Sequence, residues 1–103
     1  MNQVNLIGRI TKDLELKYTN NQTAKVSFSL AINGKDRTDY PRIIVWGKQA
    51  ENLEKYCGKG SLVGITGRIQ TGNYEQDGKT VYVTDVYADH IEFLSWDKKG
   101  EDY

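Results

Sequence analysis

The stretch Tyr40-Pro41-Arg42-Ile43-Ile44-Val45-Trp46-Gly47-Lys48 decides the fold of this chain. Its apolar centre predicts a buried strand that carries a large aromatic residue and a cation toward each end. Tyr40 and Trp46 are six positions apart, so on a regular strand both rings lie on one face. Flat rings beside Arg42 and Lys48 suit unpaired bases and their phosphates, because stacking requires only a π-face. Core aromatics on a hydrophobic strand would produce the same pattern, so both interpretations stay open at this point.

Chain length and cysteine content limit the number of domains and the cellular compartment that we expect. The 103 residues suffice for one domain. Cys57 is the only cysteine, which excludes an intrachain disulfide and fits a reducing compartment. The amino terminus lacks the pattern of a signal peptide, and no apolar run is long enough to cross a bilayer. We therefore expect a cytoplasmic protein with no membrane partner.

The charge balance is neutral, with 14 basic and 14 acidic residues. Neutrality argues mildly against a nucleic-acid partner, since such proteins usually carry a basic excess. Three acidic residues, Asp97, Glu101 and Asp102, are however concentrated at the carboxyl end. A basic groove elsewhere on the surface therefore remains compatible with the neutral total.

Hydrophobic periodicity predicts strands on both sides of the central stretch. Residues 4–10 form one candidate, with Gly8 marking a sharp bend. Residues 24–32 alternate, so one face carries Ala24, Val26, Phe28, Leu30 and Ile32, and the other carries Lys25, Ser27, Ser29 and Ala31. Asn33-Gly34 is a hairpin signal before the chain returns from Arg37 onward. Phe28 is assigned to the core.

One helix and further strands follow. Between Gly47 and Cys57, an apolar stripe predicts a helix that ends at Gly58 and Gly60; its members are Ala50, Leu53, Tyr56 and Cys57. Residues 62–70 and 80–88 predict strands joined across Asp77-Gly78. The apolar phase of residues 80–88 is mixed, which either a bulge or two-sided burial would explain. Residues 91–96 predict a last short strand or an extended tail.

This order of elements predicts an all-β fold with one short helix between the third and fourth strands. It matches the five-stranded Greek-key barrel known as the OB-fold, which binds oligonucleotides or oligosaccharides. We expect residues 1–96 to form this domain and residues 97–103 to be a short flexible tail.

Several motifs resemble the bacterial and phage single-stranded DNA-binding proteins. The similar segments, in order, are residues 7–19 (IGRITKDLELKYT), 45–52 (VWGKQAEN), 59–63 (KGSLV), 67–71 (GRIQT), 82–86 (YVTDV) and 88–94 (ADHIEFL). The resemblance extends over about residues 3–95 and implies an OB-fold, a single-stranded DNA partner and usually a homotetramer, although a dimer is also possible.

The resemblance also implies roles for individual residues. The family's stacking aromatics correspond to Tyr40, Trp46 and Tyr74, and its phosphate contacts to Arg42, Lys48 and Lys59. Other cations that could contact the DNA backbone are Arg9, Lys12, Lys17, Arg37 and Arg68.

The chain also departs from the family pattern. The positions before Tyr74 that are often basic in relatives are here Gln70, Gly72 and Asn73, so we expect weaker binding with a shallower salt dependence. The short connection from Gly34 to Thr38 lacks a further stacking aromatic that many relatives have. Residues 97–103 contain no long linker with an acidic tip, which makes recruitment of other replication proteins through the tail doubtful.

No motif predicts catalysis, a cofactor or a metal. His90 has no Cys/His cluster around it and is expected to be structural or solvent-facing, and Cys57 is expected to be a buried small hydrophobe. The expected function is sequence-independent binding of single-stranded DNA in replication, recombination or repair. The alternative is an OB adaptor of the primosomal type that acts mainly through protein contacts. RNA binding stays open, because stacking does not inspect the 2′-hydroxyl.

Overall fold

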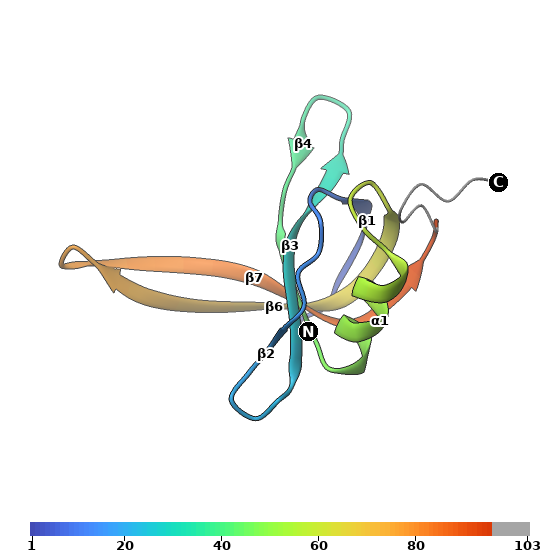
Figure 1. Ribbon diagram of the computed structural model, residues 1–103. Coiled ribbons are helices and arrows are strands. Elements are labelled where there is room, and N and C mark those ends of the chain that lie inside the picture. Colours follow the sequence, from blue (N-terminus) through green and yellow to red (C-terminus); the bar gives the residue numbers. More distant parts are fainter. Residues whose placement is uncertain (96–103) are drawn as a thin grey trace.

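Five long or medium strands, two very short strands and one helix make up the computed structural model, which describes residues 1–95. The elements are β1 (Val4–Ile10), β2 (Lys17–Tyr18), β3 (Ala24–Asn33), β4 (Thr38–Asp39), β5 (Arg42–Trp46), α1 (Lys48–Tyr56), β6 (Leu62–Gln76) and β7 (Lys79–Phe93) (Figure 1). Trp96 and the expected tail, residues 97–103, lie outside the described part of the chain.

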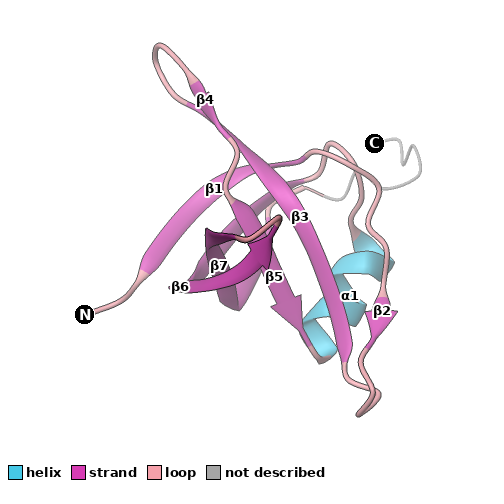
Figure 2. Ribbon diagram, turned by 90° about the vertical axis from the view of Figure 1, so that its left-hand side faces the viewer, coloured by secondary structure: helices cyan, strands magenta, loops and turns pink. Residues whose placement is uncertain are grey.

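The sheet closes into a ring. In the order β1-β6-β7-β5-β3, neighbouring strands are hydrogen-bonded, and β3 pairs again with β1 through Arg9 opposite Ala31 and Ile10 opposite Leu30. All these pairs are antiparallel except β5 with β7. Figure 2 shows the closed barrel, with the two short strands β2 and β4 attached to β3. The predicted OB barrel, with its helix between the third and fourth long strands, is therefore confirmed.

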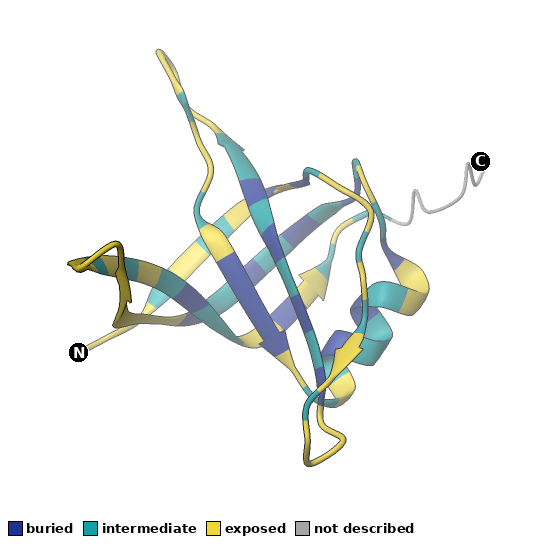
Figure 3. Ribbon diagram, turned by 60° about the vertical axis from the view of Figure 1, so that its left-hand side comes forward, coloured by how far each residue is buried: buried dark blue, intermediate teal, exposed yellow. Residues whose placement is uncertain are grey.

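Alternation along β3 divides the barrel into an inside and an outside. Ala24, Val26, Phe28 and Leu30 are buried in the core, while the residues between them are partly exposed (Figure 3). Helix α1 packs against β3 and β5 through buried Ala50 and Leu53. The predicted core positions of Phe28 and Cys57 are confirmed, because both side chains belong to the buried cluster.

The central strand is shorter than predicted. The structure places β5 at Arg42–Trp46, with Tyr40 and Pro41 before it and Lys48 already in α1. Pro41 has no backbone N–H to give to a ladder, although its carbonyl oxygen still accepts a 3.0 Å hydrogen bond from the Leu30 N–H. At the other end, Gly47 has a φ of 72°, a conformation that favours glycine and turns the chain into α1. The prediction of one strand from residue 40 to residue 48 was therefore wrong at both ends.

Strands β6 and β7 are longer than predicted and form an arm. From Arg68 to Thr80 every residue is exposed, and the hairpin extends well beyond the barrel (Figures 1 and 3). The pairing is uninterrupted between Val83 and Val86, so no bulge causes the mixed apolar phase there. Val86 instead points into the core, whereas Val81 and Val83 belong to the arm, on the other face of the same strand. Two-sided use of β7 explains the pattern.

A β-bulge lies further along β7. Thr66 pairs with His90 and Gly67 pairs with Ala88, which leaves Asp89 as the additional residue. Because of this additional residue, the core-facing positions of β7 are even-numbered before the bulge, as at Val86, and odd-numbered after it, as at Ile91. Residues 91–93 therefore continue β7 instead of forming a separate strand.

Within residues 1–95, none of the helical structure is both long enough and apolar enough to cross a membrane.

Gly8 is required by the close approach of β1 to β3. A Cβ at Gly8 would collide with the Ala31 carbonyl oxygen and come within 2.9 Å of Leu30 Cγ. We expect Gly8→Ala to lower the free energy of unfolding by about 1–3 kcal/mol, the usual cost of overpacking. Urea denaturation at a fixed protein concentration measures this change.

Gly72→Ala is the matched control for this substitution. A Cβ at Gly72 on the arm would meet only Val83 Cγ2, at an ordinary 3.8 Å. Its unfolding free energy should stay within about 0.5 kcal/mol of the wild-type value. Equal stability of the two variants would contradict the proposed close approach.

Candidate nucleic-acid interface

Trp46 stands on the outer face of β5. The flanking residues Ile43 and Val45 belong to the core cluster, so Arg42 and Trp46 point outward with Ile44 between them. The Trp46 side chain is 37% exposed, which is enough for part of its ring to meet a ligand. The interpretation of Trp46 as a pure core aromatic is therefore wrong.

The outer face continues from β5 onto β7 and β6. Ile44 is paired with Tyr87, and Tyr87 is paired with Arg68. The Arg68 guanidinium carbon lies 5.9 Å from the centre of the Tyr87 ring, within the range of a cation–π contact. Sequence analysis did not select Tyr87. Its pairing opposite Ile44 depends on a parallel register that no local pattern reveals.

Tyr74 lies on the same face of the β6–β7 arm. Positions 68, 70, 72 and 74 of β6 share one side because they are spaced by two, and Tyr74 pairs with Val81. Half of the Tyr74 surface is exposed. The arm therefore carries this ring outward along the face that begins at Trp46 and Arg68.

Tyr40 is exposed but does not belong to β5. It precedes Pro41 in the break between β4 and β5, and 61% of its surface is accessible. The regular strand that was expected to align Tyr40 with Trp46 is absent at this point. Its shared face with Trp46 therefore does not follow from strand geometry.

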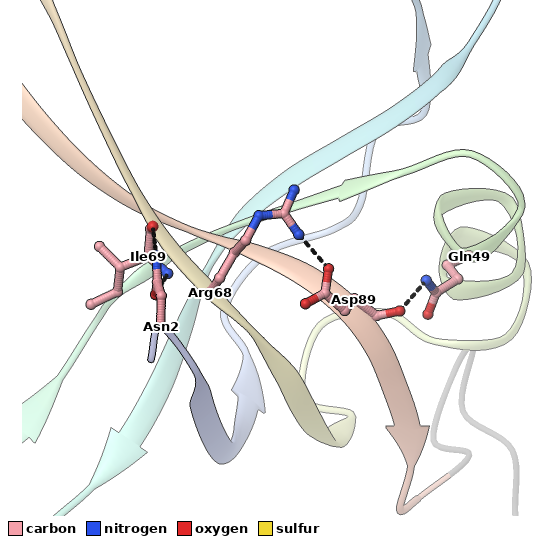
Figure 4. Close-up of polar contacts among 5 residues, drawn as sticks. All are labelled: Asn2, Gln49, Arg68, Ile69 and Asp89. Atoms are coloured by element: carbon pink, nitrogen blue, oxygen red, sulfur yellow. Dashed lines mark hydrogen bonds and ion pairs between the residues drawn. The ribbon is translucent and has the colours of Figure 1, made fainter.

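Both arginines on the outer face are engaged by carboxylates. Arg42 Nε lies 4.0 Å from Asp85 Oδ1, and Arg68 Nη1 lies 2.5 Å from Asp89 Oδ1. Figure 4 shows Arg68 and Asp89 together with Gln49 of α1, whose Nε2 donates a 2.8 Å hydrogen bond to the Asp89 carbonyl oxygen. The bulged residue Asp89 is thus held from two sides, and it positions Arg68.

The root of the arm is tied to the amino-terminal segment. Asn2 Nδ2 donates to the Ile69 carbonyl oxygen and Asn2 Oδ1 accepts from the Ile69 N–H, both at 2.8 Å (Figure 4). This reciprocal pair is formed just beyond Arg68, where the arm leaves the barrel. It restrains the direction in which Tyr74 is presented.

The remaining predicted phosphate contacts are distributed over other elements. Lys48 begins α1 and lies 3.9 Å from Glu51. Arg9 Nη1 donates a 2.8 Å hydrogen bond to the Gly60 carbonyl oxygen, and Lys59 is exposed beside Gly60. The structure therefore gathers Arg42 and Arg68 with Trp46 and Tyr87. Lys59 lies in the turn before β6, and the Arg9 side chain reaches this turn from β1.

Lys25 is a second residue that sequence analysis did not select for the site. It pairs with Trp46 across β3 and β5, and its Nζ lies 5.1 Å from the centre of the indole ring. The alternation of β3 already placed Lys25 on the outward face. The cross-strand register, which supplies its partner, was the missing information.

Metal-ligating side chains do not gather in the part of the chain that the structure describes. Residues 1–95 contain no group of three or more His, Cys, Asp or Glu residues that could hold a metal ion. His90 faces solvent, as expected, with its Nε2 3.3 Å from Glu92 Oε1. The described face therefore offers rings and cations for binding.

Comparison with known proteins agrees with this geometry. The model of the "Single-strand binding protein family" matches residues 1–94. A single-stranded DNA-binding protein of Bacillus cereus is 50% identical over 102 residues, covering 91% of this chain and 60% of the relative. One from Clostridium tetani is 50% identical over 107 residues, with 96% and 74% covered. Single-stranded DNA-binding protein 3 of Listeria innocua is 45% identical over 108 residues, with 97% and 68% covered.

The chain spans about three fifths of the Bacillus cereus relative's length, and 91% of this chain takes part in the similarity. The family match covers the barrel, the helix and the complete arm, and therefore every residue of the face described above. This chain belongs to the single-strand binding protein family.

Proposed function

We propose that this protein binds single-stranded DNA without sequence preference and protects it during replication, recombination or repair. The observation that carries the proposal is the partly exposed Trp46 ring on the outer face of a closed barrel, with Arg42 and Arg68 on the same face. The family relationship supports the same ligand. The proposed place of action is the cytoplasm of a bacterial or phage-infected cell, where replication unwinds DNA.

The proposed mechanism is passive binding without a chemical step. Bases stack on Trp46 and Tyr74, with Tyr40 as a further candidate, at about 1–3 kcal/mol for each base. Cations neutralise the phosphates; those proposed are Arg42, Lys48, Lys59, Arg9 and Arg68. Duplex DNA is a poor ligand, because its bases are already stacked on each other inside the helix.

The ion pairs of the two arginines affect the strength of binding. A phosphate that contacts Arg42 or Arg68 has to compete with Asp85 or Asp89. Arg68 and Asp89 are both about half exposed, and solvent-exposed pairs contribute only about 0.2–1 kcal/mol. Asp85 is only 17% exposed, but it lies at the longer distance of 4.0 Å from Arg42. The exchange is therefore feasible, but each contact gains less than a cation with no acidic neighbour would.

We also propose that the protein assembles as a homotetramer. Ile7 of β1 is 63% exposed and Leu94 is 44% exposed, and both approach the position of a Cβ on Gly64. Together with Gly64 these residues form a small apolar patch on the outer side of β1 and β6, and Glu92 lies at its edge. An exposed apolar surface of this kind is typical of a contact between subunits.

An adaptor that binds other proteins is the second candidate function. The opposite face of the arm exposes Ile69 (45%) and Tyr82 (77%), two large side chains that are not on the Trp46 face. Neutral Gln70, Gly72 and Asn73 along the arm are consistent with weak DNA binding. The adaptor predicts a dimer with little affinity for oligonucleotides.

Titration with a thymidine oligomer and with a duplex of equal length distinguishes the two functions. We expect the single strand alone to bind, as measured by fluorescence anisotropy of the labelled DNA, and added salt to weaken the binding. Failure to bind either DNA would contradict the proposed function and favour the adaptor. A uridine oligomer in the same assay measures any preference for DNA over RNA.

Trp46→Ala tests the stacking platform. We expect a loss of about 1–3 kcal/mol in binding free energy for thymidine and mixed-sequence oligomers alike, because stacking does not depend on base identity. Tyr56→Ala is the control: Tyr56 is similarly exposed (41%) but lies at the end of α1. Unchanged affinity of Trp46→Ala would exclude Trp46 from stacking.

Ile7→Glu tests the proposed subunit contact. We expect the assembled mass, measured by sedimentation equilibrium, to decrease from four subunits because a carboxylate in an apolar contact is costly to desolvate. Tyr18→Glu, at a residue 58% exposed on β2, should leave the mass unchanged. A wild-type protein that sediments as a monomer would overturn the proposed assembly.

A further inference from the structure

The Lys25 side chain covers part of the ring that a base is proposed to occupy. Its ammonium lies 5.1 Å from the centre of the Trp46 ring. A cation over an indole is attracted to the negative face of the ring, so this contact is favourable while no ligand is bound. A base that stacks on this face has to displace Lys25, and the displaced ammonium then requires another partner.

Lys25 also has a like-charged neighbour on its other side. In the antiparallel pair of β2 and β3, Lys17 stands directly opposite Lys25. Like charges in directly opposed positions destabilise a sheet. Glu15 offsets part of the repulsion, since its carboxylate lies 3.4 Å from Lys17 Nζ. An anion bound between the two lysines would remove more of it.

A hollow on the outer face brings further cations to the same place. Two adjoining depressions share Lys12, Ser27 and Arg42 in their linings, and one of them also contains Lys17 and Lys25. Glu15 is the only carboxylate in either lining. The lining therefore holds four cations and one carboxylate, and Asp85 approaches Arg42 from outside the lining at 4.0 Å, so cations remain in excess here although the chain as a whole is neutral.

We propose that Lys12, Lys17, Lys25 and Arg42 form a subsite for a phosphodiester group of the bound strand, and that Lys25 moves from the Trp46 ring to this phosphate when a base stacks. This inference rests on the proposed function, since it identifies which phosphate the strand presents beside the Trp46 ring. Lys25 thereby couples two events: the ring becomes accessible and the phosphate is neutralised.

The chemistry of the lining suits a phosphodiester. Its two non-bridging oxygens share one negative charge and accept hydrogen bonds. The Ser27 hydroxyl supplies a neutral donor between Lys25 and Arg42. The lining is polar and charged, which does not suit the apolar face of a base. The neighbouring indole does, so base and phosphate of one nucleotide have separate and adjacent positions.

Lys25→Met tests the subsite, because it removes the charge and keeps much of the length of the side chain. Trp96→Phe is included in every protein so that tryptophan emission reports on Trp46 alone. The matched control is Lys55→Met, which removes a lysine that lies 5.2 Å from the ring of Tyr56 on α1. Lys25→Arg restores the charge and shows whether loss of charge, and not misfolding, causes any defect.

The measurement is a titration with a thymidine oligomer at several salt concentrations. For Lys25→Met we expect the slope of log K against log salt to become shallower by about 0.7, the value for one phosphate contact on a single strand. Lys55→Met and Lys25→Arg should retain the slope of the parent protein. The emission of Trp46 in Lys25→Met should differ from the parent before DNA is added and coincide with it at saturation.

An unchanged slope in Lys25→Met, with normal binding by the parent protein, would overturn the subsite and leave the proposed function intact. An equal decrease of the slope in Lys55→Met would also overturn it, because the effect would then reflect total charge. If the parent protein itself does not bind the oligomer, the proposed function and the subsite are both wrong.

Discussion

The pairing of β3 with two partners is the constraint on which the rest of the structure depends. Its first half is hydrogen-bonded to β5 and its end to β1, so the same strand both continues the sheet and closes it. Closure requires a close approach at Gly8, where a side chain would not fit. It also separates the two faces of β3 completely: Val26 and Phe28 fill the barrel, while Lys25 and Ser27 remain outside. The candidate interface is thus a direct consequence of how the core is built.

The cations of the outer face are distinguished by their positions and neighbours, because the protein as a whole has no excess of basic residues. The chain is neutral, and both arginines beside the aromatic rings have an aspartate of β7 as a neighbour. These carboxylates orient the guanidinium groups, and they would compete with the phosphates of the proposed DNA ligand. Lys25 of β3 differs from these arginines, because it faces Lys17 and an aromatic ring, whereas Lys17 itself is paired with Glu15. Cations of one face would therefore lose different contacts on the proposed binding of DNA.

Local sequence patterns predicted the helix and the strands better than the pairing and register between the strands. Alternation located β3, and the glycines at both ends of α1 located the helix, because each depends only on neighbouring residues. The extent of the central strand was overestimated, since the backbone effects of Pro41 and Gly47 end it sooner than its apolar composition indicates. The contacts of Trp46 with Lys25 and of Tyr87 with Arg68 were missed. Both depend on the register between strands, which is set by closure of the whole sheet.

The shortness of β5 has a consequence for the candidate interface. Only Arg42, Ile44 and Trp46 point outward from it, and Ile44 is 2% exposed, so a single aromatic ring is presented by this strand. Additional rings have to come from elements that begin elsewhere: Tyr87 from β7, Tyr74 from the arm and Tyr40 from the break before β5. A strand of DNA that contacts several of them has to run across the strands of the barrel and onto the arm. The restraint of the arm by Asn2 and the support of Asp89 by Gln49 then matter for binding, because they determine how far Tyr74 stands from Trp46.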